Sequence, residues 1–137
     1  MDLSGTEFGF DCPGGGSIEI LTGQDINVLT TVFRDDGSML INTLDFYSNV
    51  TGVGVGSPGG VPIDGIKYRL SNISNQFSVS LASGAFRYSF VSFIKATAIG
   101  KGPDIFGYTV QTMGMRADGT PTISIDRGHL YCPASRN

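Results

Sequence analysis

The chain has 137 residues and a mass of 14.5 kDa, the size of a single domain. Hydrophobic residues make up 40% of it, so a packed core needs no metal ion, while only 15% charged residues and 20 glycines favour an all-β domain over a helical one. The net charge of −3, without any Lys/Arg run, argues against a nucleic-acid surface, and no apolar run reaches the roughly eighteen residues of a membrane span.

Alternating apolar residues and turn signals predict a series of strands in the first part of the chain. Residues 1–6 are polar, and we expect them to be loosely attached. An Asp36-Gly37 turn between alternating hydrophobic residues predicts a hairpin. The strands expected here cover residues 7–12, 17–22, 26–34 and 39–51.

The glycine-rich residues 52–65 form the one long connection. They do not fit a dinucleotide-binding loop, because a strand pattern follows them and leaves no helix N-terminus for a phosphate. We expect a mobile loop at the mouth of a barrel, the place where loop motion would gate a cavity.

The second part of the chain continues the strand pattern around its most apolar stretch, Phe86–Ile99. Its apolar residues also fit helical spacing, but β-branched and aromatic residues dominate and no helix cap precedes them, which favours a strand. We expect bulges near Thr112 and Gly128, a second hairpin at Asp118-Gly119, and a kink near Ser92. The strands expected here cover residues 66–71, 77–81, 86–99, 106–115 and 122–132.

Short turns between sequential strands predict an antiparallel up-and-down sheet. Long strands and the absence of any helix to cover a sheet face favour closure into a single-domain β-barrel of about eight strands over residues 1–137, with residues 133–137 as a loose tail. A two-layer β-sandwich is the alternative.

Cys12 and Cys132 lie near the two ends of the chain. We expect a disulfide that ties the first strand to the last, which implies an oxidising compartment; two unrelated buried thiols are the alternative. No apolar signal segment follows Met1, so we expect the mature form of an exported protein with a start methionine added. Asn49 and Asn72 lie in N-x-S/T sequons, and whether either is glycosylated stays open.

Several segments together resemble small exported bacterial β-proteins, most of them uncharacterised. These segments are Phe10-Asp11-Cys12, Asp36-Gly37-Ser38, residues 98–104 and the closing stretch from Asp118-Gly119 to Cys132. The layout is also similar to lipocalin-like, avidin-like and allene-oxide-cyclase-like barrels, a likeness that implies binding or reshaping of apolar small molecules. The chain has no Trp, which lipocalins usually carry near the first strand, and we transfer no residue roles.

Five side chains are candidates for a ligand site inside the barrel. Tyr88 and Tyr108 lie on the apolar parity of neighbouring predicted strands, and Phe90 shares the parity of Tyr88. Arg127 and the single histidine, His129, share the parity of the last strand's isoleucines. An inward Arg–His pair would mark a site because buried charge needs a partner, whereas a bulge at Gly128 would turn both outward.

Three further expectations concern the rest of the predicted interior. Asp45 and Tyr47 have the parity opposite to Leu44 and Phe46, and we expect them to face solvent. Beyond Ser92, either Phe93 or Ile94 points inward. One histidine and two oxidised cysteines leave only carboxylates, so we expect neither a metal site nor a cofactor.

The leading functional hypothesis is a secreted β-barrel module that binds a small hydrophobic or aromatic molecule in its interior. A second hypothesis is a cofactor-free isomerase or cyclase that uses the same cavity, with Tyr88 and Tyr108 orienting the substrate, joined by Arg127 or His129 if either projects inward. A third is a structural or adhesive interaction module with a filled core. Cavity volume separates the third from the first two.

Overall fold

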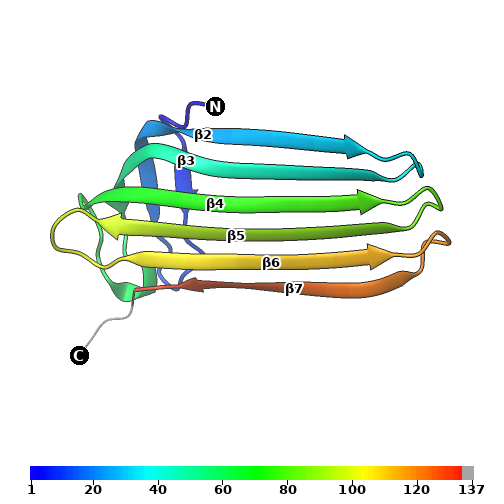
Figure 1. Cartoon of the computed structure of the whole chain (residues 1–137). Coiled ribbons are helices and arrows are strands. Elements are labelled where there is room, and N and C mark those ends of the chain that lie inside the picture. The colour runs from blue at the N-terminus through cyan, green and yellow to red at the C-terminus, as the bar shows by residue number, and fades with distance from the viewer. Residues whose placement is uncertain (134–137) are drawn as a thin grey trace.

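A computed structural model describes residues 1–133, which form one antiparallel sheet of seven strands in sequential order (Figure 1). The elements are β1 (Glu7–Gly9), β2 (Ser17–Phe33), β3 (Met39–Val55), the 3₁₀ turn η1 (Pro58–Gly60), β4 (Lys67–Ser80), β5 (Phe86–Ala98), β6 (Ile105–Met115) and β7 (Pro121–Tyr131). The predicted all-β class and up-and-down topology are confirmed. Hairpins join β2 to β3 at Asp36-Gly37 and β6 to β7 at Asp118-Gly119, as expected.

The sheet curls through 216° and stays an open half-barrel, so the expectation of a closed barrel is wrong. The number of strands explains part of the difference between the expected closed barrel and the observed half-barrel. Predicted strands 17–22 and 26–34 are one continuous β2, and predicted strands 66–71 and 77–81 are one continuous β4. Six long strands and the three-residue β1 are too few to close at this curl, and β7 pairs only with β6 within the described residues.

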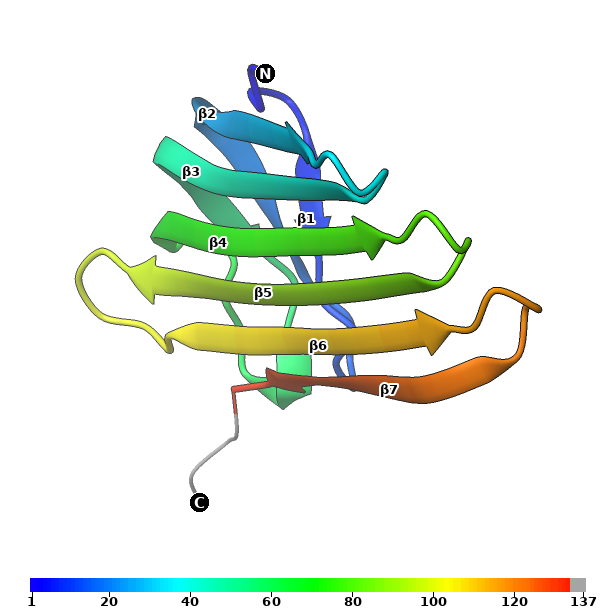
Figure 2. The same cartoon turned by 45° about the vertical axis from the view of Figure 1, so that its right-hand side comes forward.

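A sharp bend in β2 and β3 gives the half-barrel one closed end. The pairing of these strands is irregular between Ile20 and Gln24, and that of β3 with β4 is irregular between Phe46 and Val50. Gly23 has a φ of 123° there, and a Cβ on it would lie 2.5 Å from the Cα of Val50, so only glycine fits this crossing. β1 and the bent ends of β2 and β3 therefore lie behind the main sheet (Figure 2).

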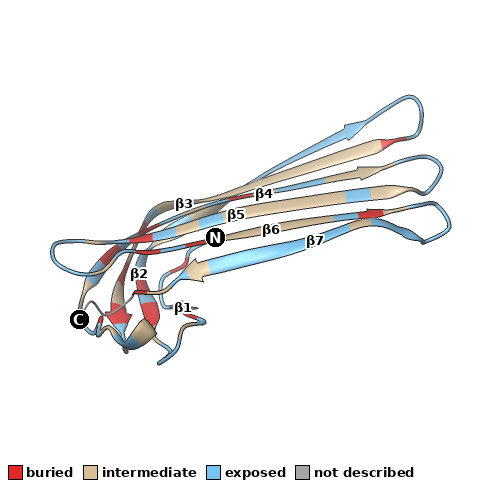
Figure 3. Ribbon diagram, turned by 90° about the horizontal axis from the view of Figure 1, so that it is seen from below, coloured by how far each residue is buried: buried red, intermediate tan, exposed pale blue. Residues whose placement is uncertain are grey.

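The hydrophobic core fills this closed end, where most of the buried segments in Figure 3 lie. Tyr68 and Ile63 are fully buried in it. The core consists of Leu3, Phe10, Ile18, Ile20, Val50, Ile63, Tyr68, Leu70, Ala96 and Ile105. The other half of the sheet extends from it as a single layer with largely accessible side chains (Figure 3).

Residues 52–65 do not form the mobile loop that we expected at a barrel mouth. Their first four residues complete β3, and Ile63 inserts into the core. Backbone hydrogen bonds fix the rest: Gly54 N donates to Ile66 O at 2.8 Å, and Ile63 N donates to Gly56 O at 2.9 Å. The segment is thus a packed wall of the closed end.

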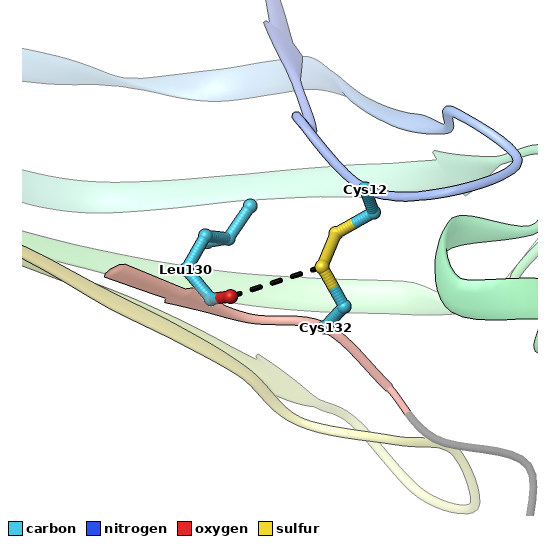
Figure 4. Close-up of a disulfide and its surroundings, with 3 residues drawn as sticks. All are labelled: Cys12, Leu130 and Cys132. Atoms are coloured by element: carbon cyan, nitrogen blue, oxygen red, sulfur yellow. Dashed lines mark hydrogen bonds between the residues drawn. A yellow bond between two sulfur atoms is a disulfide. The ribbon is translucent and has the colours of Figure 1, made fainter. Parts of the chain in front are cut away.

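Both ends of the described chain are anchored at the closed end. Residues 1–6 are not loose, because Leu3 is buried and its N–H donates to Gly23 O at 3.0 Å. The predicted disulfide is confirmed: Cys12 and Cys132 are bonded, with their Cα atoms 5.9 Å apart (Figure 4). This bond hints at an oxidising, extracytoplasmic location. Pro133 is buried, and residues 134–137 of the predicted loose tail lie outside the described residues.

The three irregularities predicted in the second half are absent. β5 pairs with β4 and β6 without a break at Ser92 or Thr112, and β7 pairs with β6 without a break at Gly128. The one register shift between β6 and β7 falls at Gly114 and Met115. No helix within residues 1–133 is long and apolar enough to cross a membrane.

Candidate interaction surfaces

The strand register assigns each side chain to one of the two faces of the sheet. Residues directly opposite each other on antiparallel strands point to the same face, and successive residues alternate. Tyr68 pairs with Ala98, and Leu70 pairs with Ala96, which pairs in turn with Ile105. We call the face that these core residues occupy the inner face, and the opposite one the outer face.

The five predicted ligand residues divide between these two faces. Tyr88 and Phe90 lie on the inner face, since they pair with Ser78 and Gln76 in the parity of Leu70. Tyr108 pairs with Phe93, which lies on the outer face. Arg127 and His129 pair with Val110 and Tyr108, so they lie on the outer face too. The register of β5 with β6 thus places the two tyrosines on opposite faces of the sheet. In the sequence each tyrosine only shares the parity of apolar residues on its own strand, which does not say to which face that parity points.

His129 and Arg127 are exposed. His129 belongs to an aromatic cluster that lies where β6 begins and β7 ends. The ring centroids of His129 and Tyr131 are 4.2 Å apart in an edge-to-face arrangement. Tyr131 stacks on Phe106 with centroids 5.4 Å apart. Neither Arg127 nor His129 reaches the interior, and Leu130 takes the inner face instead. The outward orientation follows from strand register and not from a bulge at Gly128.

Asp45 and Tyr47 lie on the inner face, so our expectation that they face solvent on the outside is wrong. Asp45 pairs with Ser74 in the parity of Leu70, and Tyr47 packs against the core. The irregularity between Phe46 and Val50 reverses the alternation of β3, so that Val50 points inward and Phe46 points outward. Alternation counted along the whole strand therefore assigned Asp45 and Tyr47 to the wrong face.

Four polar side chains meet on the inner face where the closed end opens. Asn27 Nδ2 donates to Asp45 Oδ1 at 2.5 Å. Burial, with a smaller contribution from the charge of Asp45, raises the pKa of Asp25 above its ordinary value. Burial and the charge of Asp25 likewise raise the pKa of Tyr47. This corner of the sheet is therefore negative and only partly solvated.

The outer face of the single-layer half carries an apolar stripe across five strands. Its first row, in which neighbours are paired across the strands, is Ile26, Phe46, Ile73, Phe93 and Tyr108. A second row contains Val28, Leu44, Val91 and Val110. Ile73 is 59% exposed and Phe93 49% exposed. Sequence reasoning missed this surface because strand alternation alone does not say which face is covered.

The inner face of the same half also exposes apolar side chains. Leu29 is 63% exposed and Phe33 77% exposed, both on β2, and Met113 on β6 is exposed as well. The half-buried Phe86, Tyr88 and Phe90 lie on the same face of β5. Neither face of the single-layer half is thus covered by the described residues.

The basic side chains of the strands all lie on one face of the sheet. This is the outer face, and the residues are Lys67, Arg69, Arg87, Lys95 and Arg127. The inner face carries three strand carboxylates, Asp25, Asp45 and Asp126, and no strand Lys or Arg. Two further carboxylates, Glu7 and Glu19, lie on the outer parity at the closed end, so the outer face is basic in net charge and the inner face is acidic.

A groove of about 670 Å³ lies where the closed end meets the single-layer half. Phe8 and Asp11 border it on one side, and the floor is formed by strands β4 to β7. Its floor residues on the inner face are small or polar apart from Ile94 and Leu130, and include Asn72, Ser92, Thr109 and Gly128. The expectation that one of Phe93 and Ile94 points inward is resolved in favour of Ile94.

The chain matches no family model, no curated protein and no solved structure. The resemblances drawn from its sequence therefore gain no support beyond the half-barrel architecture, and its function has to be argued from the surfaces themselves.

Proposed function

We propose that this protein is a structural interaction module whose uncovered sheet packs against another protein chain. The observation that carries the proposal is the area of its surface. A folded monomer of this mass exposes about 6,900 Å² by the scaling for single-chain proteins, whereas this chain exposes 8416 Å². This chain therefore exposes about 1,500 Å² more than expected, which is nearly twice the roughly 800 Å² that each partner buries in a standard interface.

The character of the exposed surface supports the same proposal. Scattered apolar residues are normal on a protein surface, but contiguous apolar patches mark interaction sites. The outer stripe is contiguous, because Ile73 of β4, Phe93 of β5 and Tyr108 of β6 are directly paired. Aromatic residues, which dominate the energy of protein interfaces, form part of it.

Gel filtration of an extract from the native source tests the proposal. We expect the wild-type protein to elute in an assembly larger than the 14.5 kDa chain, and the Phe93→Asp variant to elute as the free chain. Lys101→Asp, which changes an exposed turn residue, is the control and should behave like the wild type. Far-UV circular dichroism and an intact disulfide establish that each variant is folded. Elution of the wild type as a free chain would overturn the proposal.

Binding of a small amphipathic molecule is the second candidate, favoured by the groove of about 670 Å³. Phe8, Ile94 and Leu130 offer apolar contacts, and Asp11 and Asn72 offer polar ones. Native mass spectrometry of the protein from its own source tests it: a co-purified molecule that is lost in the Leu130→Glu variant supports this candidate. An isomerase or cyclase is no longer proposed, since it needed a titratable group in the interior, and Arg127 and His129 are both exposed on the outer face, where Tyr108 also lies.

A further inference from the structure

We propose that the chain that covers this sheet is a second copy of the same protein, stacked head to tail, with the outer face of one copy against the inner face of the next. This inference rests on the proposed function and names its partner. It is argued from the two exposed faces, from their charges and from their curvature.

Exposure of both faces excludes a simple symmetric pair as the complete assembly. In a two-fold dimer each copy contributes the same patch, so only one face of each sheet is covered. The other face would keep its exposed residues, either Ile73 and Phe93 outside or Leu29 and Phe33 inside. A head-to-tail contact uses both faces of every internal copy, and a single type of interface then covers all of these side chains.

The charges of the strands favour the same arrangement. Two outer faces in contact would place Arg87, Lys95 and Arg127 on both sides of the interface. Two inner faces in contact would place Asp25, Asp45 and Asp126 on both sides. Like charges that face each other across an interface weaken the contact. Among the strand charges of the single-layer half, only outer-on-inner stacking opposes basic side chains to carboxylates.

The shape of the sheet is consistent with this contact. The sheet curls through 216° around the inner face, so the outer face is convex and the inner face is concave. The single-layer half projects away from the core, which leaves its concave side open to a neighbour (Figure 3). Apolar side chains of β5 then face each other, with Phe93 and Val91 of one copy above Phe86, Tyr88 and Phe90 of the next.

Sedimentation velocity of the purified protein over a range of concentrations is the first test. We expect association beyond a dimer, because a head-to-tail contact leaves a free face at each end. Arg87→Asp combined with Arg127→Asp should weaken association by at least about tenfold, since both charges then repel the inner carboxylates. Lys101→Asp, a change of the same sign in an exposed turn, should leave association close to that of the wild type.

Cross-linking between two variants that each add one cysteine to the disulfide-bonded pair identifies the faces in contact. Ser89→Cys places a thiol on the outer face and Ser78→Cys places one on the inner face, on adjacent strands. A bismaleimide of short span needs no reductant, so the Cys12–Cys132 bond stays intact. We expect linked dimers in the mixture of the two variants and none in either variant alone. Linked dimers of Ser89→Cys alone, or of Ser78→Cys alone, would show a symmetric contact and overturn the inference.

A purified protein that stays monomeric at all concentrations and forms no cross-links also overturns the inference. The proposed function then stands or falls separately by the gel filtration of the native extract. A large assembly there, together with a monomeric purified chain, identifies a different protein as the partner. A free chain in both experiments overturns the inference and the proposed function together.

Discussion

Tyr68 donates a hydrogen bond from its phenol Oη to the backbone carbonyl oxygen of Pro103, 2.9 Å away. The ring of Tyr68 is fully buried, and this bond ties β4 to the turn between β5 and β6. We expect Tyr68→Phe to lower the free energy of unfolding by about 1 kcal/mol, because it leaves the carbonyl without its partner. Urea unfolding measures the change. The exposed Tyr131, changed to Phe, is the control and should shift stability by less than about 0.5 kcal/mol.

Gly52 lies directly opposite Tyr68, and the space above it is filled. A Cβ on Gly52 would overlap Ile18 Cγ2 and lie 2.6 Å from the carbonyl oxygen of Glu19. We expect Gly52→Ala to destabilise the protein by about 1 to 3 kcal/mol, the usual cost of overpacking. Gly9→Ala is the matched control, because a Cβ there meets nothing within 4 Å. Equal midpoints of thermal unfolding for the two variants would contradict this account of the closed end.

The disulfide between Cys12 and Cys132 closes a loop with a sequence separation of 120 residues. We expect the double variant Cys12→Ser/Cys132→Ser to lose about 2 to 5 kcal/mol of stability, since the unfolded chain regains its freedom. Guanidinium unfolding measures this loss. The slope of the transition should also rise, because the denatured state becomes less compact. An unchanged midpoint would show that anchoring of β7 by strand pairing alone suffices.

Asp25 gives the stability a dependence on pH. Its pKa is raised in the folded protein, mainly by burial, so the folded state holds its proton more tightly than the unfolded state does. Stability from this group is therefore present at low pH and is lost as the pH rises through the folded pKa. We expect Asp25→Asn to stabilise the protein at pH 7 and to have little effect below the unfolded value of 3.8. Urea midpoints at both pH values test this.

Asp36 should show the opposite dependence on pH. Hydrogen bonds from the hydroxyl and the backbone N–H of Ser38 lower the pKa of Asp36. Its contribution is therefore present above the unfolded pKa and is lost as the pH falls through the folded pKa. We expect Asp36→Ala to destabilise the hairpin at pH 7 and to have no effect in strong acid. The same sign of pH dependence for Asp25 and Asp36 would refute both assignments.

Local pattern predicted the strands best where a turn signal or a repeating alternation is decisive. Asp36-Gly37 and Asp118-Gly119 form the expected hairpins because glycine readily takes the positive φ that these tight turns require, 83° at Gly37 and 85° at Gly119. The disulfide between Cys12 and Cys132 was predicted as well, because the chain has only these two cysteines and they lie near its two ends. The break expected between residues 71 and 77 was wrong, because polar residues continue a strand when both neighbouring strands pair with it. The break expected between residues 22 and 26 is instead a bend with irregular pairing inside the continuous β2.

The candidate interaction surfaces could not be predicted from local sequence patterns, because they depend on the register in which the strands pair. Tyr88 and Tyr108 each share the parity of the nearby apolar residues of their strands, yet they lie on opposite faces because β5 pairs Phe93 with Tyr108. Asp45 moved to the inner face through an irregularity in β3 that has no single-residue signal. The sorting of Arg87 and Arg127 from Asp126 by face is likewise invisible until the strands are aligned.

The sequence by itself determined the all-β class, the up-and-down order, the two Asp-Gly hairpins and the disulfide, because each follows from interactions between residues close in the chain or from the chemistry of two cysteines. Only the tertiary structure decided that the sheet stays open, that its core fills one end, and that its faces differ in charge. These properties depend on curl and register, which are set by the sum of cross-strand contacts and bulges along the whole sheet.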